Sequence, residues 1–138
     1  MNAALTLMQP TVRLADSSLD TLAVAHYEQV YALAHAFYDD PSVCLSLANQ
    51  AFRDATGNPE LVTVCRNLIS LLSRRPGLEL PVPSHTLLSN AAWLMKEIVS
   101  LRYAEIGEVL HMDVEQVKHE IAAVRETLLT LTADSAAA

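Results

Sequence analysis

The sequence is poor in glycine, cysteine, aromatic residues and charge. Its 138 residues include three glycines, two cysteines, 5% aromatic residues and 18% charged residues. Three dispersed glycines, at positions 57, 77 and 107, cannot build a glycine-rich phosphate-binding loop. Two cysteines are too few for a disulfide scaffold or a four-cysteine zinc site, and they fit a reduced, cytoplasmic protein.

Export signals, membrane spans and an excess of basic charge are also missing. The first ten residues lack the basic opening that a signal peptide needs. No run approaches about 18 uninterrupted apolar residues, so the sequence predicts no membrane-spanning helix. Nine basic against sixteen acidic side chains leave a net charge of −7. This balance argues against nucleic-acid binding through bulk electrostatics.

No catalytic or metal-binding pattern is present. None of the histidines has a histidine partner at i+3 or i+4, the spacing of a helical metal site; they are His26, His35, His85, His111 and His119. Cys44 and Cys65 lie on predicted helices and are interpreted as small core residues. No nucleophile stands in a recognisable arrangement with a base. We therefore predict that the protein is not an enzyme and uses no cofactor or metal ion.

Abundant alanine and leucine, in a chain with 51% apolar residues, predict an all-α fold. The apolar spacing predicts helices over roughly 18–38, 41–55, 59–75, 85–98, 103–110 and 114–131. Asp40, directly before a proline, suits an N-cap, and Asn58 before Pro59 repeats that device. Asp113 is expected to cap the last helix, with Gln116 completing a capping box.

A cluster of helix breakers divides the chain into two halves. Pro76, Gly77, Pro81 and Pro83 lie within eight residues and predict a linker. Ser84 at its end suits the N-cap of the next helix. The division is a flexible N-terminal tail over 1–17, a helical domain over 18–75, a linker over 76–84, a second helical domain over 85–132 and a C-terminal tail over 133–138.

Residues 101–118 have the pattern of a helix–turn–helix motif. The expected inward side chains are Ile106, Val109 and Leu110, with Met112 and Val114 filling the turn. Gly107 is expected to let the second helix approach closely. In DNA-binding proteins the second helix of this motif enters the major groove. Periodicity alone equally allows an ordinary helical hairpin.

This motif resembles region 4 of the extracytoplasmic-function (ECF) sigma factors, small two-domain members of the sigma-70 family. The matching residues are Tyr103-Ala104-Glu105-Ile106, Glu108-Val109-Leu110, Val114 and Val117-Lys118. The first half of the chain resembles region 2 of that family, through Tyr31 to Ala34, Asp40-Pro41, Leu47, Phe52, Ala55 and Arg66-Asn67-Leu68. The resemblance implies a three-helix region 2-like domain, an interdomain linker and a region 4-like helix–turn–helix domain.

The chain departs from the family where partners are contacted. Family members dock on the RNA polymerase clamp helices through acidic residues on the second helix, and the matching surface here is uncharged: Val43, Leu45, Ser46, Asn49 and Gln50. Val43 and Leu45 therefore predict an outward apolar strip. The segment that reads the −10 element in the family shrinks here to residues 56–60.

The DNA-facing side is depleted of cations. Residues 76–138 hold four basic against nine acidic side chains, a net charge of −5. Weak or no DNA binding is expected from so few phosphate contacts among carboxylates. The candidate DNA-binding residues are Arg102, Gln116, Lys118, His119 and Arg125.

Three functions are compatible with these patterns. The first is a sigma-like transcription regulator that acts mainly through protein contacts, with an anti-sigma factor, the RNA polymerase core or a second copy as partner. The alternative is a functional ECF sigma factor that directs polymerase to promoters. The third is a plain helix–turn–helix DNA-binding protein whose first half dimerises. No membrane contact is expected.

Overall fold

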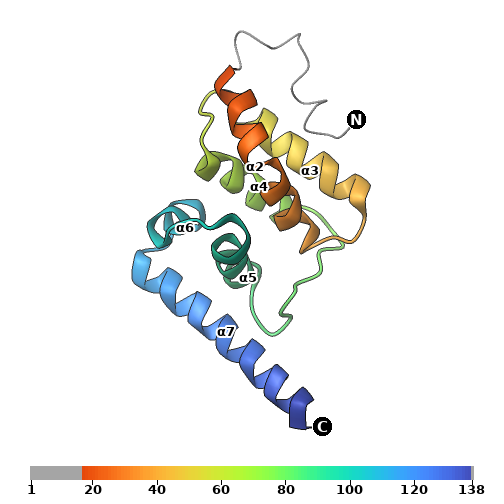
Figure 1. Ribbon diagram of the computed structural model, residues 1–138, viewed down its shortest axis with the longest axis vertical. Helices are drawn as coiled ribbons and strands as arrows, with labels where there is room; N and C mark the ends of the chain where they lie inside the picture. Colours follow the sequence, from red (N-terminus) through yellow and green to blue (C-terminus); the bar gives the residue numbers. More distant parts are fainter. Residues whose placement is uncertain (1–16, 138) are drawn as a thin grey trace. The chain divides into compact units, whose positions relative to one another are not determined.

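The computed structural model describes the backbone of residues 17–137 and the side chains of residues 19–133, and this part of the chain is helical with no strand (Figure 1). The elements are α2 (Ser17–His35), α3 (Pro41–Arg53), α4 (Leu61–Ser73), α5 (Leu87–Leu94), the π-helix η2 (Met95–Val99), α6 (Tyr103–Leu110) and α7 (Val114–Ala137). The all-α prediction is confirmed. The predicted N-terminal tail lies outside the described residues, apart from Ser17.

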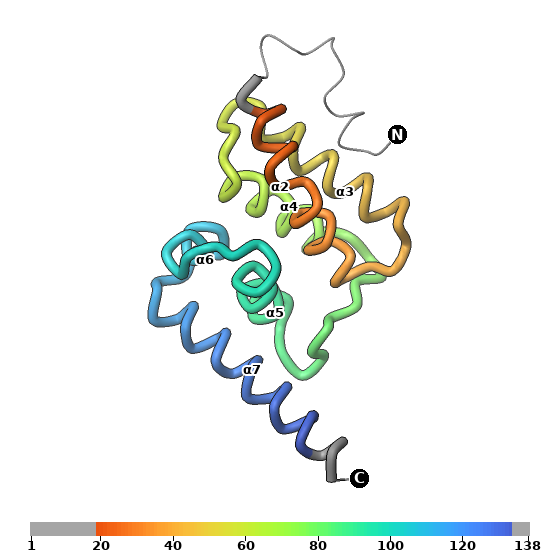
Figure 2. Tube along the Cα trace, in the orientation of Figure 1, coloured from red at the N-terminus to blue at the C-terminus, as the bar shows by residue number. Residues whose placement is uncertain are grey.

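The chain divides into two compact units, the first ending at Glu79 and the second beginning at Leu80. This boundary falls inside the stretch predicted as a linker. The finer division into 18–75, 76–84 and 85–132 stays a prediction. The backbone trace in Figure 2 follows α2, α3 and α4 in the first unit and α5, α6 and α7 in the second.

The first unit is a three-helix assembly around an apolar core. Each of its helices packs against the other two. Its largest fully buried side chains are Phe37, Phe52, Leu33, Leu68, Leu72, Val30 and Val64. The Tyr27 ring stacks on Phe52 at 5.7 Å between centroids, and its hydroxyl donates to Asn49 Oδ1 at 2.7 Å. Burial raises the pKa of this phenol to about 12. Cys44 and Cys65 are buried free thiols, in agreement with their assignment to the core.

The turns of the first unit follow the sequence signals in one place and depart from them in another. Asp40 caps α3 as predicted, its Oδ1 accepting from Ser42 N at 2.9 Å. Asn58 does not cap α4, because residues 54–58 continue in consecutive turns that postpone the helix. Glu60 takes the N-cap position without a side-chain bond. Asn58 Nδ2 instead donates to Thr63 Oγ1 at 3.1 Å.

In the second unit α5 and α6 pack against α7. Its largest fully buried side chains are Met95, Ile106, Ile121, Val82 and Val117. The expected N-cap at Ser84 is wrong, since Thr86 Oγ1 accepts from Ser89 N at 3.1 Å and α5 begins at Leu87. The helix then widens into the π-turn η2, which ends at Ser100 with a left-handed φ of 62°.

The start of the second unit is fastened by one buried amide. Asn90 is fully buried, and its Oδ1 accepts from Val82 N at 2.8 Å. Its Nδ2 donates to the carbonyls of Val82, His85 and Thr86 at 3.1, 3.3 and 2.8 Å. These bonds hold residues 82–86 in a turn, which explains why the helix starts later than the sequence suggests. Val82, in the predicted linker, is consequently buried.

The turn between α6 and α7 depends on Gly107. A Cβ on this residue would lie 2.5 Å from the carbonyl oxygen of Met112, whose own N–H bonds to the Gly107 carbonyl at 3.0 Å. His111 reverses the chain with a left-handed φ of 58°. Met112 is half-buried, whereas Val114 is 37% exposed and does not fill the turn as predicted.

The last helix is longer than the sequence suggests. The predicted inward positions Ile106, Val109 and Leu110 of α6 are buried against it. The predicted end near Leu131 is wrong, because α7 stays helical to Ala137 and continues past α5 and α6 (Figure 1). Among the helices described here, none combines the length and apolar character needed to cross a bilayer.

Candidate functional site

The helix–turn–helix motif, α6 and the first half of α7, is the best-defined candidate site. Asp113 Oδ1 accepts from Gln116 N at 2.8 Å, which confirms the expected cap of α7. The predicted capping box is incomplete, because the Gln116 side chain donates to Glu120 Oε2 at 2.5 Å and not to the backbone of Asp113. The turn and both helix starts are therefore fixed by local bonds.

Arg102, a predicted DNA contact, lies at the N-cap of α6 and is bound by a carboxylate of the same helix. Glu105 Oε1 accepts from Arg102 N at 2.9 Å and from Arg102 Nε at 3.2 Å. The backbone bond from Arg102, more than the guanidinium charge, holds the pKa of Glu105 below its usual value. The Arg102 side chain is 81% exposed, so this ion pair is weak and screened by salt.

Lys118 belongs to a cationic cluster around Tyr103. Its Nζ lies 3.7 Å from Glu115 Oε1 and 5.6 Å from the centroid of the Tyr103 ring. Lys96 from η2 approaches the same ring at 4.5 Å and donates to the Leu101 carbonyl at 3.3 Å. Both ammonium groups are therefore directed toward groups of their own unit.

Arg125 forms the shortest ion pair of the motif. Its Nη2 lies 2.6 Å from Glu97 Oε1 and its Nε lies 3.2 Å from the same oxygen. The hydrogen bond with Glu97 raises the pKa of the guanidinium above its ordinary value. The pair joins α7 to η2, so this guanidinium is engaged within its own unit.

Gln116 and His119 complete the predicted DNA-facing set, and both are exposed. Gln116 is engaged with Glu120, whose Oε1 also accepts a short hydrogen bond from Ser89 Oγ of α5. Sequence reasoning missed Ser89. The bond between Ser89 and Glu120 joins residues 31 positions apart, and no local pattern indicates it.

The predicted partner-binding residues lie on α3, and they differ in exposure. Leu45 is 37% exposed and Ser46 is exposed, whereas Val43 is half-buried. The expected apolar strip is thus limited to Leu45. Asn49 Oδ1 accepts a hydrogen bond from the Tyr27 hydroxyl, and Gln50 Nε2 donates to Asp54 Oδ1 at 2.7 Å. Both amides therefore bond within the first unit.

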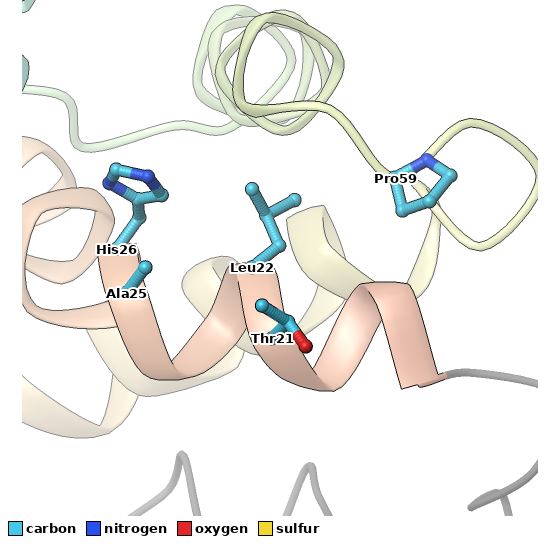
Figure 3. Close-up of a pocket in the computed structure, with 5 residues that line it drawn as sticks. All are labelled: Thr21, Leu22, Ala25, His26 and Pro59. Carbon is cyan, nitrogen blue, oxygen red and sulfur yellow. The ribbon is translucent and has the colours of Figure 1, made fainter.

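A shallow hollow lies in the described part of each unit. The hollow of the first unit has a volume of about 370 Å³. It is lined by Thr21, Leu22, Ala25 and His26 of α2 and by Pro59 of the loop before α4 (Figure 3). The second unit has a groove of about 390 Å³ between His85 and the C-terminal half of α7. The first hollow brings no group of acids, bases or nucleophiles together.

Within the described part of the chain, no group of three or more histidine, cysteine or acidic side chains is placed to hold a metal ion. Comparisons with protein-family models, with curated proteins and with solved structures found no match.

Proposed function

We propose that this chain is a sigma-70/ECF-like transcription regulator that acts in the cytoplasm mainly through protein–protein contacts, with weakened DNA recognition. The observation that carries the proposal is the state of the four cations of the second unit. Arg102, Lys118 and Arg125 each face a carboxylate, and Lys96 is held by a backbone carbonyl and an aromatic ring. Three of these four cations are therefore already paired with carboxylates before the motif could meet DNA.

Neutralisation weakens DNA binding in two ways. A cation that turns to a phosphate must leave its carboxylate, and that carboxylate then stands near the DNA backbone and repels it. Each exposed pair contributes only about 0–1 kcal/mol, so the first cost is small. The second cost, repulsion by the released carboxylate, is larger, because counterion release scales with the net number of phosphates neutralised. Residues 80–138 hold four basic and eight acidic side chains, a net charge of −4.

Protein contacts are the remaining route for a helix–turn–helix protein of this charge. An anti-sigma factor, the RNA polymerase core or a second copy of the chain is the proposed partner. The outward residues Leu45 and Ser46 of α3 are uncharged where the resemblance leads one to expect acidic side chains. A neutral surface with one exposed leucine favours desolvated contact over charge pairing.

Co-purification from the native host, followed by mixing with purified partners, tests the proposal. We expect recovery of an anti-sigma factor, core polymerase or a dimer, and a weaker complex for Leu45→Glu. Val24→Glu is the matched control, since Val24 is 70% exposed on α2, outside the predicted surface. Recovery of none of the three partners would refute the proposal.

The alternative, a functional ECF sigma factor, is supported by the well-formed helix–turn–helix turn at Gly107 and Asp113. Run-off transcription with core polymerase separates it from the first proposal. A promoter-dependent product would favour the alternative, and its absence, together with partner binding, would favour the protein-contact function.

A further inference from the structure

The groove of about 390 Å³ in the second unit follows one face of α7, beyond the helix–turn–helix motif. It is lined by His85, Ala123, Glu126, Thr127, Thr130 and Leu131. The five α7 positions alternate at intervals of three residues and one residue, so they share one face of the helix. From the first to the last they span about 12 Å along the helix axis. The groove is thus a shallow hollow whose lining follows α7.

Both sides of this groove are fixed before anything binds. Thr127 Oγ1 lies 3.2 Å from the Ala123 carbonyl oxygen and forms a hydrogen bond of 2.7 Å with His85 Nε2. Asn90 holds the backbone around His85 through the bonds described above. A preformed groove loses little conformational freedom on binding, which favours affinity.

The lining of the groove is mixed: Ala123 and Leu131 are apolar, His85, Thr127 and Thr130 are polar, and Glu126 is a carboxylate. Leu131 is 56% exposed at one end, and Ala123 lies at the other. Among the described side chains, Glu126 is the only carboxylate that lines the groove. The sequence after Arg125 contains no lysine or arginine. The described cations of the second unit contact neighbours away from the groove. None of them lines the groove, where they could offset the net charge of −4 of the unit.

We propose that this groove docks a basic amphipathic helix of a partner protein. Apolar side chains of that helix at i, i+3 or i+4 and i+7 would lie over Ala123 and Leu131, and a lysine or arginine would face Glu126. Charge complementarity selects this occupant over a second copy of the chain, because two units of net charge −4 repel each other across a face without cations. The surface is separate from α3, so it adds a contact that the proposed function does not require.

The test uses the full chain and a fluorescein-labelled, 18-residue model helix with a leucine stripe and lysines elsewhere. A second peptide keeps the same leucine stripe but replaces the lysines by glutamates. Fluorescence anisotropy at physiological salt should show saturable binding of the lysine peptide, and at least ~10-fold weaker binding of the glutamate peptide. No binding of the lysine peptide would overturn the proposal.

Matched variants show whether the groove is the binding site. Leu131→Ser should weaken binding of the lysine peptide at least ~5-fold, whereas Leu129→Ser should not, because Leu129 is 71% exposed but does not line the groove. Glu126→Lys should weaken it more than Glu28→Lys, an equal charge change in the first unit. Far-UV circular dichroism and urea midpoints check that each variant is folded.

Two outcomes would overturn the assignment. Equal losses for Leu131→Ser and Leu129→Ser would show that the peptide does not bind specifically at the groove, and equal losses for Glu126→Lys and Glu28→Lys would show that it binds through general charge. A concentration-dependent dimer in sedimentation equilibrium that Leu131→Ser abolishes would assign the groove to a second copy of the chain.

Discussion

Replacing the buried amide of Asn90 by a methyl group should destabilise the second unit strongly. Asn90→Ala removes the only described acceptor of the Val82 N–H, and Val82 is buried. The carbonyls of Val82 and Thr86 keep one partner each, from His85 N and from the backbone N–H at position 90. The largest single cost is thus the orphaned donor, about 1–3 kcal/mol.

The three lost bonds to the carbonyls, near 0.5–1 kcal/mol each in net terms, bring the expected destabilisation of Asn90→Ala to about 2.5–6 kcal/mol. Trp93, the single tryptophan, lies on α5 and reports on this unit in urea denaturation followed by fluorescence. Thr86→Ala should cost about 1 kcal/mol as the loss of a helix cap, and Ser84→Ala close to nothing. A cost below about 1 kcal/mol for Asn90→Ala would refute the reasoning.

Three further predictions concern stability. Gly107→Ala should lower the free energy of unfolding by about 1–3 kcal/mol despite the better helix propensity of alanine, since its Cβ would meet the Met112 carbonyl; a gain in urea resistance would contradict this. Asp40→Ala should cost about 1 kcal/mol and Asn58→Ala clearly less, because only Asp40 caps a helix; equal urea midpoints would count against that assignment. Tyr27 has a pKa of about 12 in the fold against 10.0 in the unfolded chain. The unfolded chain therefore ionises first and stability falls as pH rises from 10 toward 12; Tyr27→Phe should flatten this dependence in denaturation experiments at stepped pH.

Local signals predicted the helices well where the cause was local. The bounds of α6 and the caps by Asp40 and Asp113 depend on residues within a turn of each other, and all three agree with the structure. The late start of α5 depends on Asn90, which reaches back eight residues to Val82. An asparagine in a helical pattern does not indicate a hydrogen bond to a backbone group eight residues earlier.

The candidate site shows the same division between local and distant causes. The sequence identified Lys118 and Arg125 as cations of the last helix, but it could not reveal that each of them faces a carboxylate. The partner of Arg125 is Glu97, 28 residues earlier, and the bond between Ser89 and Glu120 spans 31 residues. Tertiary packing alone brings these side chains together.

The most direct test is to remove the carboxylates that pair with Lys118 and Arg125 and to measure DNA binding. Glu97→Gln with Glu115→Gln removes the carboxylates that face Arg125 and Lys118 without adding a positive side chain. Glu28→Gln with Glu79→Gln makes the same change of net charge in the first unit and serves as the control. Binding to a −35-like duplex is measured by fluorescence anisotropy over a range of salt concentrations.

The account predicts no detectable binding of the wild type or of the control near about 150 mM salt. The Glu97→Gln and Glu115→Gln variant should gain binding, with a log–log salt slope steeper by about 2, as two more phosphates are neutralised. Nanomolar binding of the wild-type chain to that duplex at this salt concentration, unchanged in the variant, would contradict the claim that its DNA-facing cations are neutralised.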